Sequence, residues 1–391
     1  MEYNFDRVIE RRNTQSDKYD SAVSKGKPAD VLPLWIADMD FKAPDCVLEA
    51  LHQRVGHGIF GYSRPGNEYF EAMKGWFGNR FGYEFDPGWV CLAPGVVVAF
   101  CVALRAYTKP GDAIIIQEPL YHPIKRSILA NARKPVINNL LQREGGSYHI
   151  DFADFEKQII DNNVKTFVLC NPHNPVGRVW SEDELRQLVD ICKAHDVLIL
   201  SDEIWCDLVF PGHTQHLLPK LAPDYRHRIV TFTSASKTFN IADLLLSNTF
   251  ISDEGLRSAF TKELSAAGIG QPSSLAMHAT RAAYSSDGAL WLDALLQYIS
   301  ANMGFIDSYL QEHIPNIRMI KPDGTYVAWL DFRQLGLSAD ELDHKTLHDA
   351  KVWLNRGDMF GDAGAGFQRV NAACPRTTLV DCMERLAKAF G

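Results

Sequence analysis

The sequence predicts an α/β protein with a mostly parallel sheet in a large domain and a smaller α+β domain beside it. Between about residues 88 and 287, short apolar runs of β-prone residues alternate with helical patterns, which is typical of strands joined by crossover helices. Beyond about residue 287 the expected strands become mixed in polarity. The chain has 391 residues, too many for one compact core, so two domains are expected.

The domain boundaries follow from where the composition changes. We assign residues 46–287 to the large domain, and residues 1–45 together with residues 288–391 to an N-terminal arm plus a small C-terminal domain. The first 45 residues read as an arm because polar residues dominate up to Pro28, before the apolar run Val31–Ala37 begins.

The individual elements follow from apolar periodicity and from capping residues. Ser181 and Glu184, three residues apart, form a capping box that opens a helix. The other predicted helices are residues 45–55, 96–107, 290–312 and one at the C-terminus. The predicted strands are residues 113–116, 166–170, 197–200, 229–232, 317–320, 326–330 and 367–371.

Composition and charge exclude several classes of function. A net charge of −8 gives no reason to expect nucleic acid or an anionic membrane as partner. The longest nearly apolar run, Val90–Leu104, contains Pro94 and Gly95 and is too short to span a bilayer. The first twenty residues are too charged for a secretory signal. The eight cysteines form no C-x-x-C pair, so we expect reduced thiols in a cytoplasmic protein and no metal site.

Polar residues follow three of the expected strands. Asn174, Asp202 and Lys237 each lie just beyond a strand end, and ligands of parallel sheets bind at that edge. A lysine there either pairs with phosphate or forms a Schiff base with a carbonyl or with pyridoxal phosphate (PLP). The hydroxyls of Ser234 and Ser236 suit a phosphate in both cases. Taken singly, each residue has a structural alternative as an ordinary polar group that ends a strand or caps a turn.

Gly95 precedes the apolar helical run that begins at Val96. The backbone amides at such a helix start form an anion site, because they face the ligand together with the positive end of the helix dipole. The structural alternative is a plain helix N-terminus.

Four motifs in register resemble the fold-type I PLP-dependent enzymes of the aminotransferase class I/II superfamily. They are Asn174–Gly177, Asp202, Ser234–Lys237 and Arg369–Asn371. Longer strings are similar to the MalY/PatB-type cystathionine β-lyases, which are C–S lyases. These strings are Ile36–Phe41, Phe60–Ser63, Ser201–Ile204, Ser236–Asn240 and Arg369–Pro375.

The resemblance implies PLP as cofactor and assigns its ring contacts. Lys237 would hold PLP covalently and remove the Cα proton of the substrate. Asp202 would keep the pyridine nitrogen protonated, because a nearby carboxylate favours the charged form. Tyr121 would stack on the ring, and Asn174 would bind the 3′-oxygen.

The resemblance also assigns the phosphate and the substrate contacts. The amides of Gly95 and Val96 would bind the phosphate with Ser234 and Ser236, helped by Tyr62 from the second subunit of a homodimer. Arg369 would bind the substrate α-carboxylate through two parallel hydrogen bonds, and Asn174, Tyr62 and Ile36 would complete the substrate site. Without the motif, Arg369 would be read as a solvated surface charge.

Three positions depart from the family pattern. Trp205 stands where aminotransferases carry tyrosine and the lyases often carry histidine. Leu245 stands where many aminotransferases carry a phosphate-binding arginine or lysine. The lyase branch also tends to lack this basic residue, so its absence here favours a lyase. Asp243 places a carboxylate where a small residue is expected, and a carboxylate repels a phosphate unless it points away.

The resemblance implies β-elimination from L-cystathionine or a related cysteine S-conjugate, yielding a thiol, pyruvate and ammonia. The alternative within the same superfamily is amino-group transfer, which uses the same lysine. An alternative of another class is a protein that chiefly binds a transcription regulator, as some members of the family also do. No segment of the sequence marks a surface for such a partner.

Overall fold

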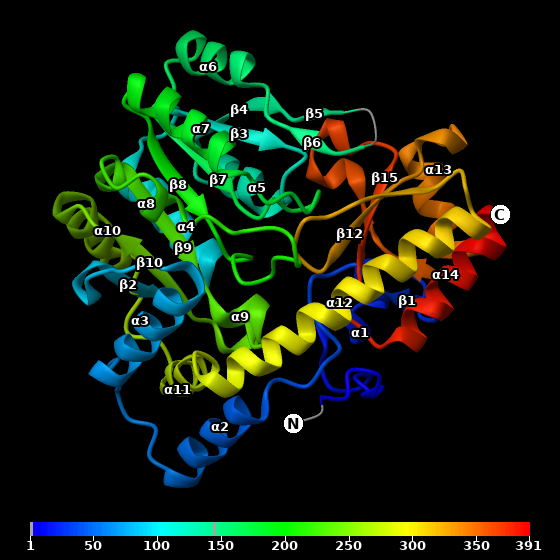
Figure 1. Ribbon diagram of the computed structural model, residues 1–391, viewed down its shortest axis with the longest axis horizontal. Helices are drawn as coiled ribbons and strands as arrows, with labels where there is room; N and C mark the ends of the chain where they lie inside the picture. Colours follow the sequence, from blue (N-terminus) through cyan, green and yellow to red (C-terminus); the bar gives the residue numbers. More distant parts are fainter. Residues whose placement is uncertain (1–2, 144–145) are drawn as a thin grey trace.

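A computed structural model describes residues 3–143 and 146–391, and it confirms the predicted α/β fold (Figure 1). Its centre is a seven-stranded sheet with the strand order β2-β10-β9-β8-β7-β3-β4. The strands of this sheet are β2 (Val90–Ala93), β3 (Ala113–Glu118), β4 (Lys134–Asn139), β7 (Thr166–Cys170), β8 (Leu198–Asp202), β9 (Ile229–Thr233) and β10 (Ser247–Ile251).

The sheet is mostly parallel, as predicted. Strands β9, β8, β7, β3 and β4 run parallel, whereas β10 lies antiparallel between β2 and β9. The central strands β7, β8 and β9 are buried along their whole length, which explains their continuous apolar runs. Their side chains alternate between two apolar cores: Phe167 and Leu169 face one, and Val168 faces the other.

Helices cover both faces of this sheet. Helices α4, α5 and α10 pack into the core that contains Val168, and α6, α7 and α8 pack into the core that contains Phe167. The helices before residue 286 are α1 (Asp17–Asp20), α2 (Asp45–His57), α3 (Asn67–Phe81), α4 (Val96–Tyr107), α5 (His122–Ala130), α6 (Phe152–Asp161), α7 (Glu182–Ala194), α8 (Leu218–Leu221), α9 (Ala235–Thr238), α10 (Glu254–Ala266) and α11 (Ser274–Ala283).

A second, four-stranded antiparallel sheet has the order β11-β12-β15-β14. The long helix α12 contacts both β11 and α14, and Figure 1 shows it running alongside this sheet. The elements of this part are α12 (Ser286–His313), β11 (Arg318–Ile320), β12 (Val327–Asp331), α13 (Ala339–His344), β13 (Val352–Trp353), β14 (Asn355–Arg356), β15 (Phe367–Asn371) and α14 (Arg376–Phe390). Strands β5 (Leu141–Gln142) and β6 (Tyr148–His149) pair with each other in a separate, short antiparallel sheet.

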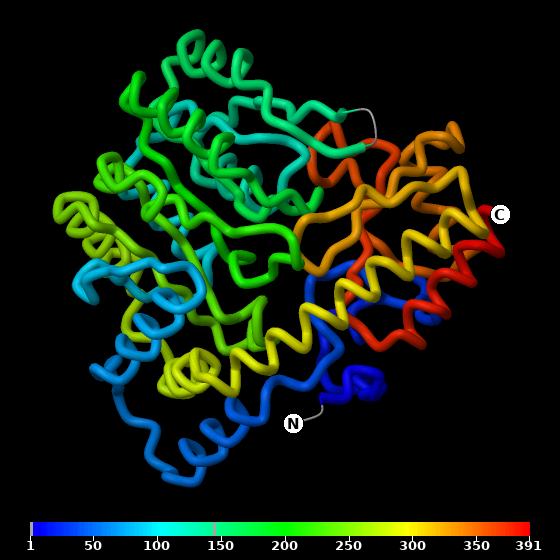
Figure 2. Tube along the Cα trace, in the orientation of Figure 1, coloured from blue at the N-terminus to red at the C-terminus, as the bar shows by residue number. Residues whose placement is uncertain are grey.

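The N-terminal arm lies against the C-terminal part of the chain, and Figure 2 shows the blue arm beside orange and red segments. Strand β1 (Leu32–Pro33) pairs in parallel with β13, and the Asn371 amide donates to the Leu34 carbonyl at 2.9 Å. One apolar core includes Phe5 of the arm and Leu386 of α14, and it also takes in residues of α3 and α11. The division at residues 45 and 287 stays a prediction, because this core crosses both boundaries.

The observed elements differ from the predicted ones mainly at their ends. Strand β8 extends through Asp202, so Asp202 is the last residue of the strand rather than a residue just beyond its end. Helix α12 begins four residues before the predicted start, where Ser285 caps it by accepting from the Gly288 amide. The predicted capping box of Ser181 and Glu184 is confirmed at the start of α7.

All eight cysteines are free thiols, and five of them are buried. Among the described residues, no helix combines the length and apolar character needed to cross a bilayer.

Candidate active site

Three predicted site residues meet at the carboxyl edge of the seven-stranded sheet. Asp202 ends β8 and lies opposite Cys170 at the end of β7, and Asn174 follows β7 by four residues. Lys237 lies in α9, directly after β9, and β9 pairs with β8. Because these strands are parallel, their carboxyl ends lie side by side, as the sequence predicts.

The amine of Lys237 is partly enclosed by protein. Its Nζ donates to the Ala37 carbonyl at 2.7 Å. Burial lowers the pKa of Lys237 to about 8, with Arg369 acting in the same direction and Asp38 and Asp202 opposing. At neutral pH about one amine in ten is therefore neutral, whereas an ordinary lysine is almost wholly charged. A neutral, positioned amine is what a nucleophile or a base requires.

Asp202 is a buried carboxylate with unused hydrogen-bonding capacity. One of its oxygens accepts from the Ile204 amide at 3.2 Å, and the other oxygen has no hydrogen bond among the described residues. Burial raises the pKa of Asp202 to about 6, against the Ile204 amide and the charge of Lys237. No lysine or arginine in the described part of the chain forms an ion pair with it. A cationic ligand group would therefore stabilise its charged form.

Arg369 is buried, in contrast to the solvated charge expected of an arginine outside a motif. Its guanidinium donates to Asn174 Oδ1 at 3.0 Å and to the Trp35 carbonyl at 3.0 Å. It also donates to Asn355 Oδ1 at 2.5 Å and lies 5.0 Å over the ring of Phe360. Burial lowers the pKa of Arg369 to about 10.

The charge of Arg369 is not balanced by a carboxylate among the described residues. All its acceptors are neutral oxygens, its Nε is buried without a partner, and no carboxylate within the described residues pairs with it. A buried charge is stabilised by a charge of opposite sign. The surroundings of Arg369 therefore suit an anionic ligand such as a carboxylate.

Tyr121 and Asn174 are held together through the backbone. The Tyr121 amide donates to the Asn174 carbonyl at 3.0 Å. The side-chain amide nitrogen of Asn174, Nδ2, makes no hydrogen bond within the described residues, so it is free to donate to a ligand. Tyr121, Val96 and Asp202 line one small cavity of about 10 Å³. The structure therefore brings Tyr121 beside Asp202, as a residue that stacks on a ring requires.

The start of α4 differs from the prediction in one respect. Gly95 has φ +94°, a conformation that L side chains rarely adopt, which explains the glycine. Its own amide, however, donates to the Ala93 carbonyl at 2.8 Å. The amides available to an anion are therefore those of Val96, Val97 and Val98, because the Ala99 amide already donates to the Gly95 carbonyl at 3.1 Å.

Ser234 already has a structural role. Its hydroxyl lies 2.6 Å from the Leu246 carbonyl and accepts from the Ser236 amide at 3.1 Å, so it caps α9. Ser234 could donate to a phosphate only by giving up Leu246, because a hydroxyl carries one proton. Ser236 lies at the first turn of the same helix and is only partly buried.

Two predicted residues do not bring their side chains to the cluster of Lys237, Asp202 and Arg369. They are Tyr62 and Ile36. Tyr62 is fully exposed, in the segment that joins α2 to α3 at the edge of the molecule (Figure 1). It lines a cavity of about 890 Å³ with Phe60 and residues 270–275. Ile36 contributes its carbonyl, which accepts from Asn371 Nδ2 at 2.9 Å.

The positions that depart from the family pattern have separate surroundings. Trp205 is buried and packs edge-on against Tyr326, with ring centroids 4.7 Å apart. Asp243 and Leu245 are both exposed in this chain.

Sequence reasoning missed the groups that orient Lys237 and Arg369. These are the carbonyls of Trp35 and Ala37, the side chain of Asn355 and the ring of Phe360. Backbone acceptors leave no mark on residue type, so no local pattern could have found the two carbonyls. The only available signal was the string that begins at Ile36.

Comparisons with known proteins place the chain in a family. Residues 29–386 match the family of aminotransferases of class I and II. The cystathionine β-lyase PatB of Bacillus subtilis is 42% identical over 387 residues, covering 99% of this chain and 100% of PatB. The protein MalY of Escherichia coli is 34% identical over 379 residues, covering 96% of each chain.

A solved structure of similar shape is cystalysin from Treponema denticola, which contains a pyridoxal 5′-phosphate cofactor. Its TM-score is 0.95 at 36% identity, covering 100% of this chain and 99% of cystalysin. The predicted resemblance to MalY/PatB-type proteins and to the fold-type I class is confirmed. The chain belongs to the aminotransferase class I and II family.

Proposed function

We propose that this chain is a PLP-dependent C–S β-lyase that cleaves L-cystathionine or a related cysteine S-conjugate. The observation that carries the proposal is the buried guanidinium of Arg369, which has no carboxylate partner within the described residues. An α-amino acid would supply that carboxylate close to Lys237. The 42% identity to PatB supports lyase chemistry within the family.

The residues present fit PLP. Lys237 offers a partly buried amine whose pKa is lowered by desolvation to about 8, which suits covalent attachment to an aldehyde. Asp202 offers a carboxylate oxygen without a partner to a pyridinium nitrogen. Asn174 has a free N–H donor for the 3′-oxygen, and the Val96 amide faces outward from the first turn of α4 for the phosphate. When bound, PLP supplies the electron sink for the pair released at Cα.

The protein's own groups then have distinct tasks. Arg369 binds the substrate α-carboxylate through two parallel hydrogen bonds and so fixes the Cα–H bond relative to Lys237. Lys237 removes the Cα proton, the Cβ–S bond breaks, and the sulfur leaves as a thiolate that takes up a proton. The remaining three-carbon enamine is hydrolysed to pyruvate and ammonia.

Amino-group transfer is the second candidate, because the matching family is that of aminotransferases of class I and II. Transfer would use the same lysine. The two activities differ in their co-substrate. A lyase releases pyruvate from cystathionine alone, whereas an aminotransferase needs a keto acid acceptor.

The test is pyruvate release by the PLP-loaded protein from L-cystathionine, with and without added keto acid. We expect release without the acceptor and none from the Lys237→Ala variant. A strict need for the keto acid would overturn the lyase assignment in favour of transfer. A panel of cysteine conjugates in the same assay identifies the preferred thioether.

We further infer a homodimer in which Tyr62 reaches the phosphate of the partner subunit. The full exposure of Tyr62 supports this inference, because its hydroxyl has no hydrogen bond within the described residues and is available to a second chain. Ser236 and Ile36 keep their predicted roles as part of the proposal. Ser234 would bind the phosphate only by giving up the Leu246 carbonyl, and Gly95 would serve through its backbone conformation rather than through its amide. The eight free thiols support a cytoplasmic location.

A further inference from the structure

The segment Trp35–Phe41 has an unusual set of backbone partners. Beyond β1 it forms no strand and no helix, yet Ala37 and Met39–Phe41 are buried. Buried carbonyls need donors, and here the donors are side chains. The carbonyls of Trp35, Ile36, Ala37, Asp38, Met39 and Phe41 accept from Arg369, Asn371, Lys237, Tyr326, Lys18, Arg11 and Asn240.

One side of this segment contacts the candidate active site. Arg369 donates to the Trp35 carbonyl at 3.0 Å, and Lys237 donates to the Ala37 carbonyl at 2.7 Å. Trp35 therefore supplies one of the three acceptors that set the direction of the Arg369 guanidinium. A shift of the segment would turn the edge of the guanidinium that faces a substrate carboxylate.

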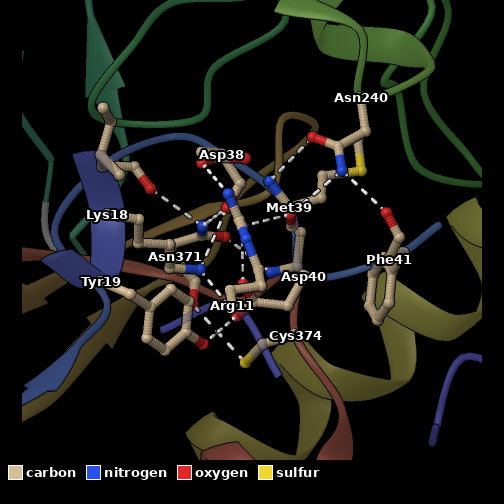
Figure 3. Close-up of polar contacts among 12 residues, drawn as sticks. Arg11, Lys18, Tyr19, Asp38, Met39, Asp40, Phe41, Asn240, Asn371 and Cys374 are labelled. Carbon is tan, nitrogen blue, oxygen red and sulfur yellow. Dashed lines mark hydrogen bonds and ion pairs between the residues drawn. The ribbon is translucent and has the colours of Figure 1, made fainter. Parts of the chain in front are cut away.

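The other side of the segment is tied to the arm by buried charges (Figure 3). The Asp40 carboxylate accepts from Lys18 at 2.7 Å, from Arg11 at 2.9 Å and from the Tyr19 hydroxyl at 3.0 Å. Arg11 also pairs with Asp38 at 2.6 Å. Lys18 has no exposed surface, and Asp40 is 4% exposed.

Charge rather than apolar burial holds this part of the arm. Between residues 6 and 30 only Lys18 and Ala22 are buried. A buried ion pair contributes little net stability, because desolvation offsets much of the attraction. It does fix direction, since the Lys18 ammonium donates to two oxygens at defined positions, Asp40 Oδ2 and the Asp38 carbonyl.

We propose that Lys18 and Arg11 are positioning residues for Arg369. By holding Asp40 they fix the segment Trp35–Phe41, and through the Trp35 carbonyl they orient the guanidinium for an α-carboxylate. This inference rests on the proposed role of Arg369, and it adds that substrate affinity depends on a cluster in the N-terminal arm.

The test compares Lys18→Met with Lys42→Met in the full-length, PLP-loaded protein. Lys42 forms an exposed ion pair with Asp45 at 2.8 Å, one residue beyond the segment, so its loss controls for charge. We expect Lys18→Met to raise KM for cystathionine at least about fivefold while kcat changes less than about threefold, because carboxylate binding is lost in both ground and transition states. Lys42→Met should match the unchanged protein.

A second measurement separates this proposal from the proposed reaction. L-Alanine carries an α-carboxylate but no leaving group, and its dissociation constant follows from the change in PLP absorbance. We expect the dissociation constant of L-alanine to rise in Lys18→Met by about the same factor as KM. This expectation holds whether the enzyme eliminates thiols or transfers amino groups.

A purely structural role gives a different pattern. Loss of folded protein lowers the apparent kcat and leaves KM and the L-alanine constant unchanged, and that result would overturn the proposal. If Lys18→Met does not fold, Arg11→Lys decides the question, because it keeps the charge but cannot bridge Asp38 and Asp40 as the planar fork does. An unchanged L-alanine constant in folded Arg11→Lys would equally overturn it.

Discussion

Arg369 on β15 donates from Nη1 to the side-chain oxygen of Asn174, 3.0 Å away, and so joins the four-stranded sheet to the carboxyl edge of the seven-stranded sheet. The two residues lie 195 positions apart in the chain. One bond thus connects the residue proposed for the substrate carboxylate with the residue proposed for the 3′-oxygen of PLP.

Replacing Arg369 by lysine tests the planar fork. Lysine keeps the charge but cannot form two parallel hydrogen bonds, and a charged hydrogen bond is worth about 1.5–3 kcal/mol. We expect kcat/KM for cystathionine to fall roughly ten- to several-hundred-fold, with PLP still bound. Steady-state kinetics with PLP absorbance as the loading control measures this. The alanine variant removes the guanidinium altogether. If Arg369→Ala still binds cystathionine normally, Arg369 is not part of the substrate site.

Lys237→Ala removes both the covalent anchor and the base. We expect elimination to fall by about 10²–10⁴-fold or more, the range for loss of a positioned acid–base group. After borohydride reduction, mass spectrometry should find PLP attached to the unchanged protein but not to the variant. Lys193→Ala, which removes an exposed lysine paired with Asp224, is the matched control. PLP still attached in Lys237→Ala would show that another lysine holds it.

The lowered pKa of Lys237 predicts how PLP uptake depends on pH. Only the neutral amine attacks an aldehyde, and burial places the pKa near 8 in place of about 10.5. The rate of covalent attachment to the apoprotein should therefore rise about tenfold per pH unit below pH 8 and level off above it. Stopped-flow absorbance between pH 6 and 10 gives the midpoint. A rate that still rises about tenfold per unit up to pH 10 would mean that the pKa of the amine is not lowered.

Tyr62 and Lys237 can be tested in mixed dimers. If Tyr62 serves the partner subunit, a dimer of one Tyr62→Ala chain and one Lys237→Ala chain contains one intact site. Random exchange of subunits should then restore about a quarter of the unmutated activity from two impaired parents, because half of the dimers are mixed. No gain after exchange, with mixed dimers confirmed by native mass spectrometry, would place Tyr62 in its own subunit's site or in none.

Gly177 predicts a difference in stability between two glycines. It has φ +71°, and an added Cβ would clash with Pro322, whereas Gly268 has φ +69° and open space around it. Gly268→Ala should lower the free energy of unfolding by about 1–2 kcal/mol from strain alone. Gly177→Ala should lower it by about 2–5 kcal/mol, because overpacking adds to the strain. Urea denaturation measures both, and equal losses would contradict the packing described at Pro322.

Much of the fold could be predicted because its signals are local. The buried runs at residues 166–170 and 367–371 have the predicted ends, and the Ser181 capping box is a pattern of two residues. The end of β8 was placed too early, because Ser201 and Asp202 are polar. Both are nevertheless buried in the strand, where Ser201 donates to Glu203 at 2.8 Å.

The site was predictable only where a residue type carries the chemistry. Lys237, Asp202 and Arg369 are recognisable from their motifs, and the structure places their side chains together. The sequence could not show whether Gly95 and Ser234 are free to bind an anion. Each already donates to a backbone carbonyl, that of Ala93 or that of Leu246. For the same reason no periodicity could have shown that the Trp35 carbonyl orients Arg369.

The pairing of β1 with β13 has a consequence for the order in which the chain matures on the ribosome. Leu32 is synthesised early, but its partner Val352 emerges only when nearly the whole chain has been made. The seven-stranded sheet is complete in sequence by Ile251, so it can form while the arm still waits without a partner. The last forty residues supply β13, β15 and α14, and with them the Arg369 side chain. The carboxylate binding proposed for Arg369 is therefore a capacity that a newly made chain acquires late.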